Sequence, residues 1–184
     1  MTWTEAPLGD LISYIGKGIV PSYTEGDEPD AITVLGQRCV RNHSVDYGQA
    51  RHHSAAKKAV KDEKVVRSGD ILINATGVGS AGRVAQVMGE PSQTCTTDGH
   101  VITLRAANID PYYLGYFVKS KQGEIEQMAE GSTGQTEMNR TRLQNEVLVT
   151  YPIDNEDQRR VADFGRAIDG KIEINTKLNG YLAA

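Results

Sequence analysis

The C-terminal stretch from Asp154 to Leu182 constrains the fold most, because it shows helical periodicity and contains no proline. Asp154 follows Pro152 and is a suitable N-cap, and Asp157 lies in the first turn, where a negative charge favours the helix dipole. At about 1.5 Å per residue the predicted helix is roughly 40 Å long. A helix of this length at the end of a small chain indicates a spacer or a dimerisation arm.

The apolar residues of this helix recur mainly at the a and d positions of a heptad, which is the pattern of a coiled-coil seam. The predicted dimerisation residues are Val161, Phe164, Ile168, Ile172, Asn175, Leu178 and Leu182. A buried Asn at an a position fixes register and partner choice in coiled coils. Lys171 occupies a d position, and glycines within the stretch weaken a free-standing helix. Two interpretations therefore stay open: a pairing arm, or an amphipathic helix packed on its own domain.

Upstream of this helix, short apolar or β-branched segments alternate with turns, which predicts an α+β domain of small mixed strands. Strands are expected at residues 31–35, extending toward 42, and at 64–66, 71–74, 83–88, 100–104 and 147–150. Asp110 and Pro111 predict a helix that runs to about residue 130, and residues 138–145 are expected to form a helical turn. Residues 43–64 are polar and lack periodicity, so we expect a long surface excursion there. We divide the chain into a domain at 1–152 and a long helix at 153–184.

The composition is compatible with one core, since 39% of the 184 residues are hydrophobic. The sequence has no apolar run approaching about 18 residues and no signal-peptide pattern, so we expect a cytoplasmic protein with no membrane association. Cys39 and Cys95 lie far apart and lack metal-ligand spacing, which favours free thiols in a reducing compartment.

Charge is distributed unevenly along a chain whose net charge is −4. Residues 1–30 hold six acids and one base, whereas residues 38–67 hold eight bases and three acids. This asymmetry can place a cationic face on an acidic protein, as nucleic-acid-binding proteins require. The alternative is a solvated loop whose charges are neutralised by the acidic segment.

Two motifs suggest enzymes that the surrounding sequence does not support. Residues 77–82 spell G-x-G-x-x-G, but the β-like run 83–88 follows where a dinucleotide site requires a helix. We therefore expect a tight glycine turn with exposed backbone amides. Residues 110–113 resemble the D-P-P-Y motif of amino methyltransferases, yet one proline is missing and the segment opens a helix. The N-cap interpretation is favoured there.

No residues form a defensible catalytic or metal-binding set. The sequence lacks G-x-S-x-G, H-E-x-x-H and C-x-x-C motifs. His52 and His53 are adjacent, so on a strand they point apart and make poor ligands of one metal. We predict a protein with no catalytic residues and no cofactor of its own.

A series of short motifs, in order along nearly the whole chain, resembles the DNA specificity subunit of type I restriction-modification systems. These motifs are PLGD at 7–10, RSGDILIN at 67–74 with its turn at 76–83, YLGYF at 113–117, GSTGQT at 131–136 with NR at 139–140, residues 145–152, EDQRR at 156–160, and the long helix. The resemblance implies a target recognition domain followed by one conserved spacer helix. A full subunit of that family holds two of each, so this chain is similar to half a subunit.

The resemblance also implies partners. We expect double-stranded DNA, DNA adenine methyltransferase subunits and a restriction/translocase subunit, with S-adenosylmethionine, ATP and Mg²⁺ bound by those partner subunits. If two copies pair through the helix in a two-fold dimer, the target is a palindromic, interrupted site. Half-sites about one DNA turn apart, roughly 34–36 Å, suit an arm of this length.

Basic and amide side chains are the expected DNA contacts, since Lys and Arg bind phosphates and Arg, Asn and Gln recognise base edges. The predicted set is Arg51, His52, Lys57, Lys58, Lys61, Asn74, Thr76, Ser80, Arg83, Gln135 and Arg140. Two other functions stay open: a stand-alone DNA-binding regulator of the same fold, and a small enzyme that binds a nucleotide at the glycine turn.

Overall fold

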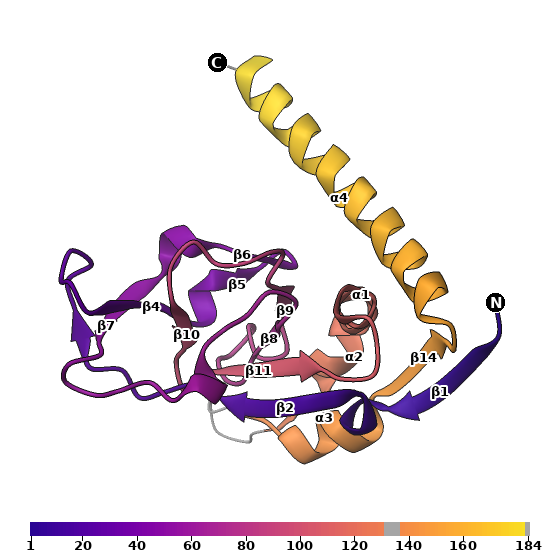
Figure 1. The fold of residues 1–184 in the computed structure, drawn as a ribbon, viewed down its shortest axis with the longest axis horizontal. Helices are drawn as coiled ribbons and strands as arrows, with labels where there is room; N and C mark the ends of the chain where they lie inside the picture. Colours follow the sequence, from indigo (N-terminus) through magenta and orange to yellow (C-terminus); the bar gives the residue numbers. More distant parts are fainter. Residues whose placement is uncertain (131–136, 183–184) are drawn as a thin grey trace.

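The structure, a computed structural model, describes residues 1–130 and 137–182. A strand-rich domain with short helices is followed by the long helix α4 (Asn155–Leu182), which leaves the domain at an angle (Figure 1). The predicted α+β class with a long C-terminal helix is confirmed. Within the described ranges, no helix is both long enough and apolar enough to cross a membrane.

The first four-stranded sheet is antiparallel and has the order β2 (Ile12–Lys17), β11 (Val101–Ala106), β8 (Ile71–Asn74), β9 (Val84–Gln86). Successive side chains of a strand point to opposite faces. Ile71 and Ile73 of β8 therefore enter one apolar cluster, while Leu72 between them enters a second cluster on the other face. Both faces are buried, which explains why β8 is apolar from Ile71 to Ile73 and was predictable from its sequence.

The second four-stranded sheet has the order β10 (Cys95–Thr97), β4 (Ala31–Leu35), β7 (Arg51–Ser54), β3 (Tyr23–Thr24). Strand β7 pairs with both β4 and β3, so the prediction of a surface excursion over 43–64 is wrong at residues 51–54, while most of the flanking residues are exposed. The strand was hidden because its inward-facing residue is a histidine. The His53 side chain is fully buried, and its Nδ1 accepts from the Ser22 amide at 2.8 Å while Nε2 lies 2.7 Å from the Lys58 carbonyl oxygen.

Around residues 37–66 the chain uses 3-10 turns where strands were expected. A 3-10 turn (Gln37–Cys39) interrupts the predicted extension of β4, and the short β5 (Val40–Arg41) then pairs with β6 (Ser44–Val45). The expected strand at 64–66 is also wrong, because a 3-10 turn (Asp62–Lys64) precedes an isolated bridge from Val65 to Thr96. Cys39 and Cys95 are free thiols buried in the core, and burial raises the pKa of Cys95 to about 11.

The predicted helix after residue 110 consists of two pieces, α1 (Pro111–Ser120) and α2 (Gln122–Gln127), separated at Lys121. Asp110 is the predicted N-cap, since its Oδ1 accepts from the Tyr112 amide at 3.0 Å and the Tyr113 amide at 2.9 Å. The short strands β12 (Ala129–Glu130) and β13 (Glu137–Met138) pair with one another. Asn139 caps α3 (Arg140–Glu146) in the same way, which confirms the helical turn expected there.

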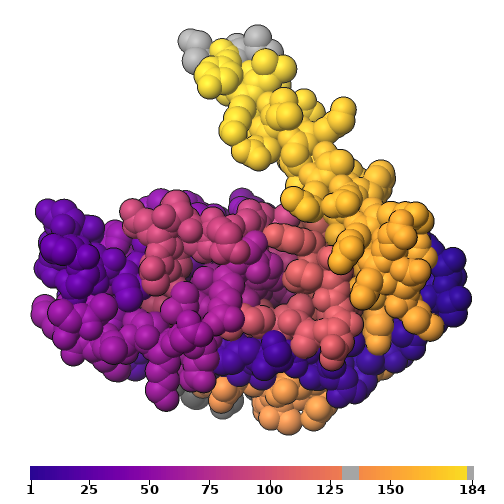
Figure 2. All heavy atoms as spheres, viewed as in Figure 1, coloured from indigo at the N-terminus to yellow at the C-terminus, as the bar shows by residue number. Residues whose placement is uncertain are grey.

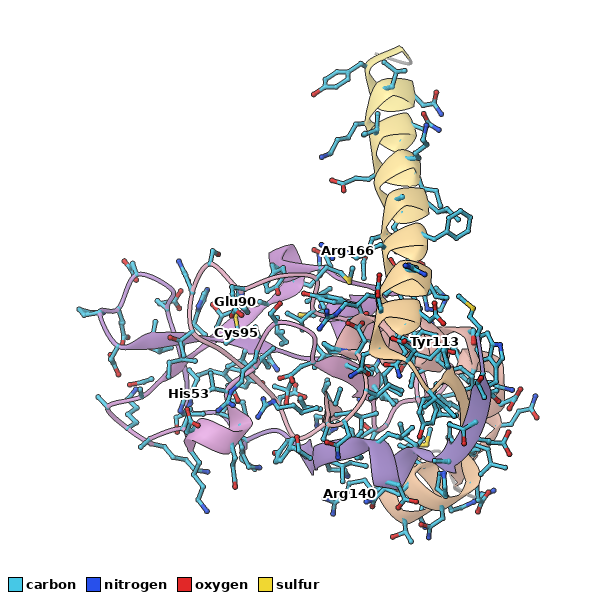
Figure 3. All side chains as sticks on the ribbon, turned by 45° about the vertical axis from the view of Figure 1, so that its right-hand side comes forward. His53, Glu90, Cys95, Tyr113, Arg140 and Arg166 are labelled. Carbon is cyan, nitrogen blue, oxygen red and sulfur yellow. The ribbon has the colours of Figure 1, made fainter. Side chains whose placement is uncertain are left out.

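The start of the chain pairs with the segment that leads into α4. After β1 (Trp3–Pro7), a 3-10 turn (Leu8–Leu11) leads into β2, and β1 pairs antiparallel with β14 (Leu148–Pro152). On α1, the Tyr113 hydroxyl donates to the Thr150 carbonyl at 2.7 Å, so the base of α4 is tied to the core (Figure 3). The pairing of β1 with β14 joins residues nearly the whole domain apart in sequence.

Helix α4 packs on the domain through a polar side near its start. The predicted cap is present, because the Asp154 carboxylate accepts from the Glu156 amide at 2.7 Å. Gln158 and Ala162 are buried, and the Gln158 amide group bonds the Asp110 amide and the Pro152 carbonyl, both at 2.8 Å. A Cβ on Gly165 would lie 2.9 Å from the Tyr116 ring, so glycine permits this close approach.

Most of the predicted seam lies on a different side of α4 and faces solvent, although Ile172 also lines a hollow between α4 and the domain. Phe164 is 70% exposed and Ile172 58% exposed, and Val161, Ile168, Asn175 and Leu178 are exposed as well; the Leu182 side chain lies outside the description. The C-terminal half of the helix stands clear of the domain (Figure 2). The exposed positions of this stripe therefore do not pack on the chain's own domain.

Candidate nucleic-acid interface

Two adjoining hollows, of about 460 and 350 Å³, form one polar groove between the two sheets' loop ends. Gln37, Arg38 and Gln49 line both hollows. We call the whole feature the arginine groove; its polar and charged lining is Gln37, Arg38, Arg41, Asp46, Gln49, Arg51, Thr76, Ser80, Arg83, Asp98 and His100. The lining holds four arginines and two aspartates, which makes it suited to an anionic ligand.

The groove arginines differ from most others in the chain by their lack of acidic partners. Six of the eleven arginines form ion pairs with carboxylates: Arg67, Arg105, Arg142, Arg159, Arg160 and Arg166. Among residues 1–130 and 137–182, the four arginines of the groove have no carboxylate oxygen within 4.0 Å. Guanidinium groups that share a groove without ion-pair partners repel one another, so this lining is suited to an anionic ligand.

Two of these arginines are held in place by their surroundings. The Arg51 guanidinium lies 3.7 Å from the centroid of the Tyr23 ring and also donates to the Tyr23 hydroxyl. The Arg83 Nη2 donates to the Gly79 carbonyl at 2.8 Å. Both side chains are therefore preorganised toward the groove, which lowers the entropy cost of binding an anion.

The glycine turn at 77–82 is a structural element that delivers Ser80 and Arg83 to the groove. Gly77, Gly79 and Gly82 all have positive φ, and a Cβ on Gly82 would lie 2.6 Å from a backbone atom of α2. The tight turn followed by a strand is confirmed. The expectation of exposed amides is wrong for residues 80–82, because their N–H groups donate to carbonyls within the turn and on Asn74.

The prediction that Asn74 contacts DNA is wrong, because this residue is buried. Its side chain is fully buried, its Nδ2 donates to the Gln37 carbonyl at 3.2 Å, and its Oδ1 has no hydrogen-bond partner among the described residues. Thr76 lies in the groove, where its hydroxyl accepts from Gln37 Nε2 at 2.5 Å and bonds His100 Nδ1 at 2.9 Å. Both residues position the groove lining.

The remaining predicted contacts lie outside the groove. Lys57, Lys58 and Lys61 are exposed on the segment after β7, and His52 is half-buried with His53 on the opposite face of the strand. Arg140 lines a separate hollow at the start of α3, on the side of the domain away from the free end of α4 (Figures 1 and 3). Gln135 lies outside the described residues.

Sequence reasoning missed seven polar or charged groove residues, namely Gln37, Arg38, Arg41, Asp46, Gln49, Asp98 and His100. Arg38 and Arg41 belong to the basic stretch 38–67, which was a usable signal. The glutamines carried no local signal, because the pairing of β4 with β7 is what brings their two segments together.

Asp98 is the acidic group that most affects the groove's electrostatics. Its carboxylate is 5% exposed and accepts from the His100 amide at 2.9 Å. Burial raises the pKa of Asp98, and the amide of His100 and the charge of Arg51 partly offset this. Asp46 is engaged as well, since its Oδ1 accepts from the Gly48 amide at 3.0 Å. Each of these carboxylates thus has one oxygen engaged by a backbone amide of its own loop.

A model of the type I restriction modification DNA specificity domain matches residues 1–183. The chain belongs to this family. The family consists of non-catalytic specificity subunits, which confirms the prediction of a recognition module that is not an enzyme. A search of curated proteins found no match.

Solved structures of type I specificity subunits share the fold. The S subunit from M. genitalium aligns with 96% of this chain at 17% identity and a TM-score of 0.63. The HsdS subunit from Thermoanaerobacter tengcongensis aligns with 95% at 17% identity and a TM-score of 0.62. A structure described as showing complex assembly and conformational transition of the type I R-M system aligns with 95% at 19% identity and a TM-score of 0.69. This chain spans only 39–41% of the length of these proteins.

Proposed function

We propose that this chain is the DNA-recognition half of a type I specificity subunit and that two copies form the complete reader. Recognition is assigned to residues 1–152 and pairing to residues 153–184. The dimer binds a palindromic, split site on double-stranded DNA. It directs DNA adenine methyltransferase subunits and a restriction/translocase subunit to that site, and S-adenosylmethionine, ATP and Mg²⁺ belong to those subunits.

The observation that carries the DNA-binding proposal is the convergence of unpaired arginines on one groove. Arg51 and Arg83 lie in different hollows, and each is held in place by a neighbour. Guanidinium groups bind phosphate oxygens bidentately, and duplex DNA presents one negative charge per about 1.7 Å of axis. The exposed lysines after β7 add sequence-independent attraction.

The length of the chain and the exposed stripe on α4 support pairing. The chain covers about two fifths of each structural neighbour, so a second copy would supply a second domain and a second helix. A two-fold interface uses the same surface on both chains. The seam positions run from 161 to 182, so an antiparallel pair that covers them places its axis near residues 171 and 172. The two domains then lie at opposite ends of the arm.

Salt-dependent binding by groove variants tests the DNA-binding proposal. Affinity of the purified protein for duplex DNA is measured between about 50 and 200 mM salt, beside the double variant Arg51→Gln/Arg83→Gln. The wild type should lose affinity steeply with salt, and the variant should bind more weakly with a slope reduced by about two per chain. As a control, Lys177→Gln removes an exposed positive charge from α4 and should leave the slope unchanged. Flat salt dependence in the wild type would contradict the proposal.

A further inference from the structure

The centre of the arginine groove is occupied by Arg38. It lines both hollows, whereas Arg51 lines only the first and Arg83 only the second. Arg38 therefore stands between two restrained guanidinium groups.

The backbone of Arg38 is fixed although its side chain is free. On one side, the Gln37 carbonyl accepts from the buried Asn74 amide at 3.2 Å; on the other, Cys39 and Val40 are fully buried. The Cys39 amide also donates to the Gly36 carbonyl at 2.9 Å and closes the 3-10 turn. Within the described ranges, the Arg38 guanidinium has no ion pair, side-chain hydrogen bond or ring contact. A guanidinium group that has no partner within the described residues, and whose backbone is fixed at the centre of the groove, is well placed to contact a base edge.

We propose that Arg38 recognises a guanine in each half-site while Arg51 and Arg83 bind the flanking phosphates. This inference rests on the proposed function. Guanine presents two acceptors, O6 and N7, on its major-groove edge, and these match the parallel donors of a guanidinium fork. Cytosine and adenine present amino donors on that edge, so reading them requires an acceptor from the protein.

Acceptors for such amino groups are outnumbered in the groove, whose lining has four guanidinium groups beside the carboxylates of Asp46 and Asp98 and the amide groups of Gln37 and Gln49. The Asp98 carboxylate is almost fully buried and accepts from His100, and Asp46 caps its own turn. The Gln37 amide group donates to Thr76. The lining around Arg38 is thus rich in donors, which favours a G·C pair at this point of the site.

The test compares Arg38→Lys and Arg38→Ala with wild type on the target duplex and on duplexes with each half-site base pair replaced in turn. Wild type should discriminate by roughly 5- to 150-fold at one G·C position, the value of one bidentate base contact. Arg38→Lys keeps the charge but loses the parallel donors, so it should reduce this preference with an unchanged salt slope, whereas Arg38→Ala should abolish the preference. Arg83→Gln, as the matched control, should weaken binding to all sequences alike and lower the slope by about one per chain.

Two results overturn the assignment of Arg38. One is an unchanged preference at every G·C position in Arg38→Ala, with unchanged affinity. The other is equal weakening on all sequences in Arg38→Ala with a slope lowered by about one per chain, which identifies a phosphate contact. Either result leaves the proposed function standing, because the wild type still binds DNA. Absence of DNA binding by the wild type refutes the proposed function itself.

Discussion

Replacing Phe164 with alanine separates the pairing role of α4 from its contribution to folding. In the single chain Phe164 is 70% exposed, so its loss should change the free energy of unfolding by no more than about 0.5 kcal/mol. In the dimer its side chain becomes buried against the partner helix, and full burial of a Phe side chain contributes about 1.5–3 kcal/mol. Scaled by the exposed fraction, each copy contributes roughly 1–2 kcal/mol, and every dimer contains two copies.

The dimer of Phe164→Ala should therefore be weaker by roughly 2–4 kcal/mol, which is about 30- to 1,000-fold in the dissociation constant. Sedimentation equilibrium over a concentration series measures this constant, and thermal unfolding of the dilute chain measures folding. Leu148→Ala serves as the control, because Leu148 is an exposed apolar residue on β14, away from α4. If Phe164→Ala and wild type associate equally, or if the wild type stays monomeric with its partner subunits present, the seam has no pairing role.

Three further predictions concern packing, acidity and the direction of pairing. Asp70→Asn should cost about 3–5 kcal/mol and lower the melting temperature by roughly 6–20 °C, because Arg105 is then left without its two-point ion pair at 2.7 and 2.9 Å. Calorimetry checks this, and a loss below about 1 kcal/mol would contradict it. Burial raises the pKa of Asp98, so its ionisation opposes folding; Asp98→Asn should be more stable than wild type at pH 7, with the difference vanishing as the pH falls below about 4. Melting curves from pH 3.5 to 7.5 measure the difference, and a gain that persists in acid would point to another cause. In an antiparallel pair with its axis near residue 171, Lys171→Cys should form a disulfide-linked dimer under mild oxidation and Leu178→Cys should not, while equal cross-linking of both indicates parallel helices.

The elements that the sequence predicted well are those whose stability is local. Helix α4 carries its own cap at Asp154 and its own periodicity, and β8 is buried on both faces, so each is marked by its residues alone. Strand β7 was missed because its buried positions are His53 and Ser54, whose polar character hides the strand. The pairing of β1 with β14 links distant segments, and no local pattern encodes it.

The candidate site was predictable only in part, because the fold assembles it from segments that are distant in sequence. The basic stretch pointed to the right region, and Arg51, Thr76, Ser80 and Arg83 do line one groove. Asn74 has the side chain of a base reader but is buried by the sheet. Arg38 is distinguished from the other groove arginines because it lines both hollows, and that depends on how the fold brings distant segments together.

Mapping of methylated adenines tests the central claim most directly. The chain is co-expressed with its type I methyltransferase subunit, and the modified bases are located by single-molecule sequencing. The account predicts one interrupted motif whose two halves are inverted repeats, and it predicts that Arg51→Gln/Arg83→Gln abolishes the modification while the subunits still co-purify. A modified motif with two unrelated halves would contradict pairing of identical chains. An intact methyltransferase complex that modifies no defined sequence would contradict the recognition role itself.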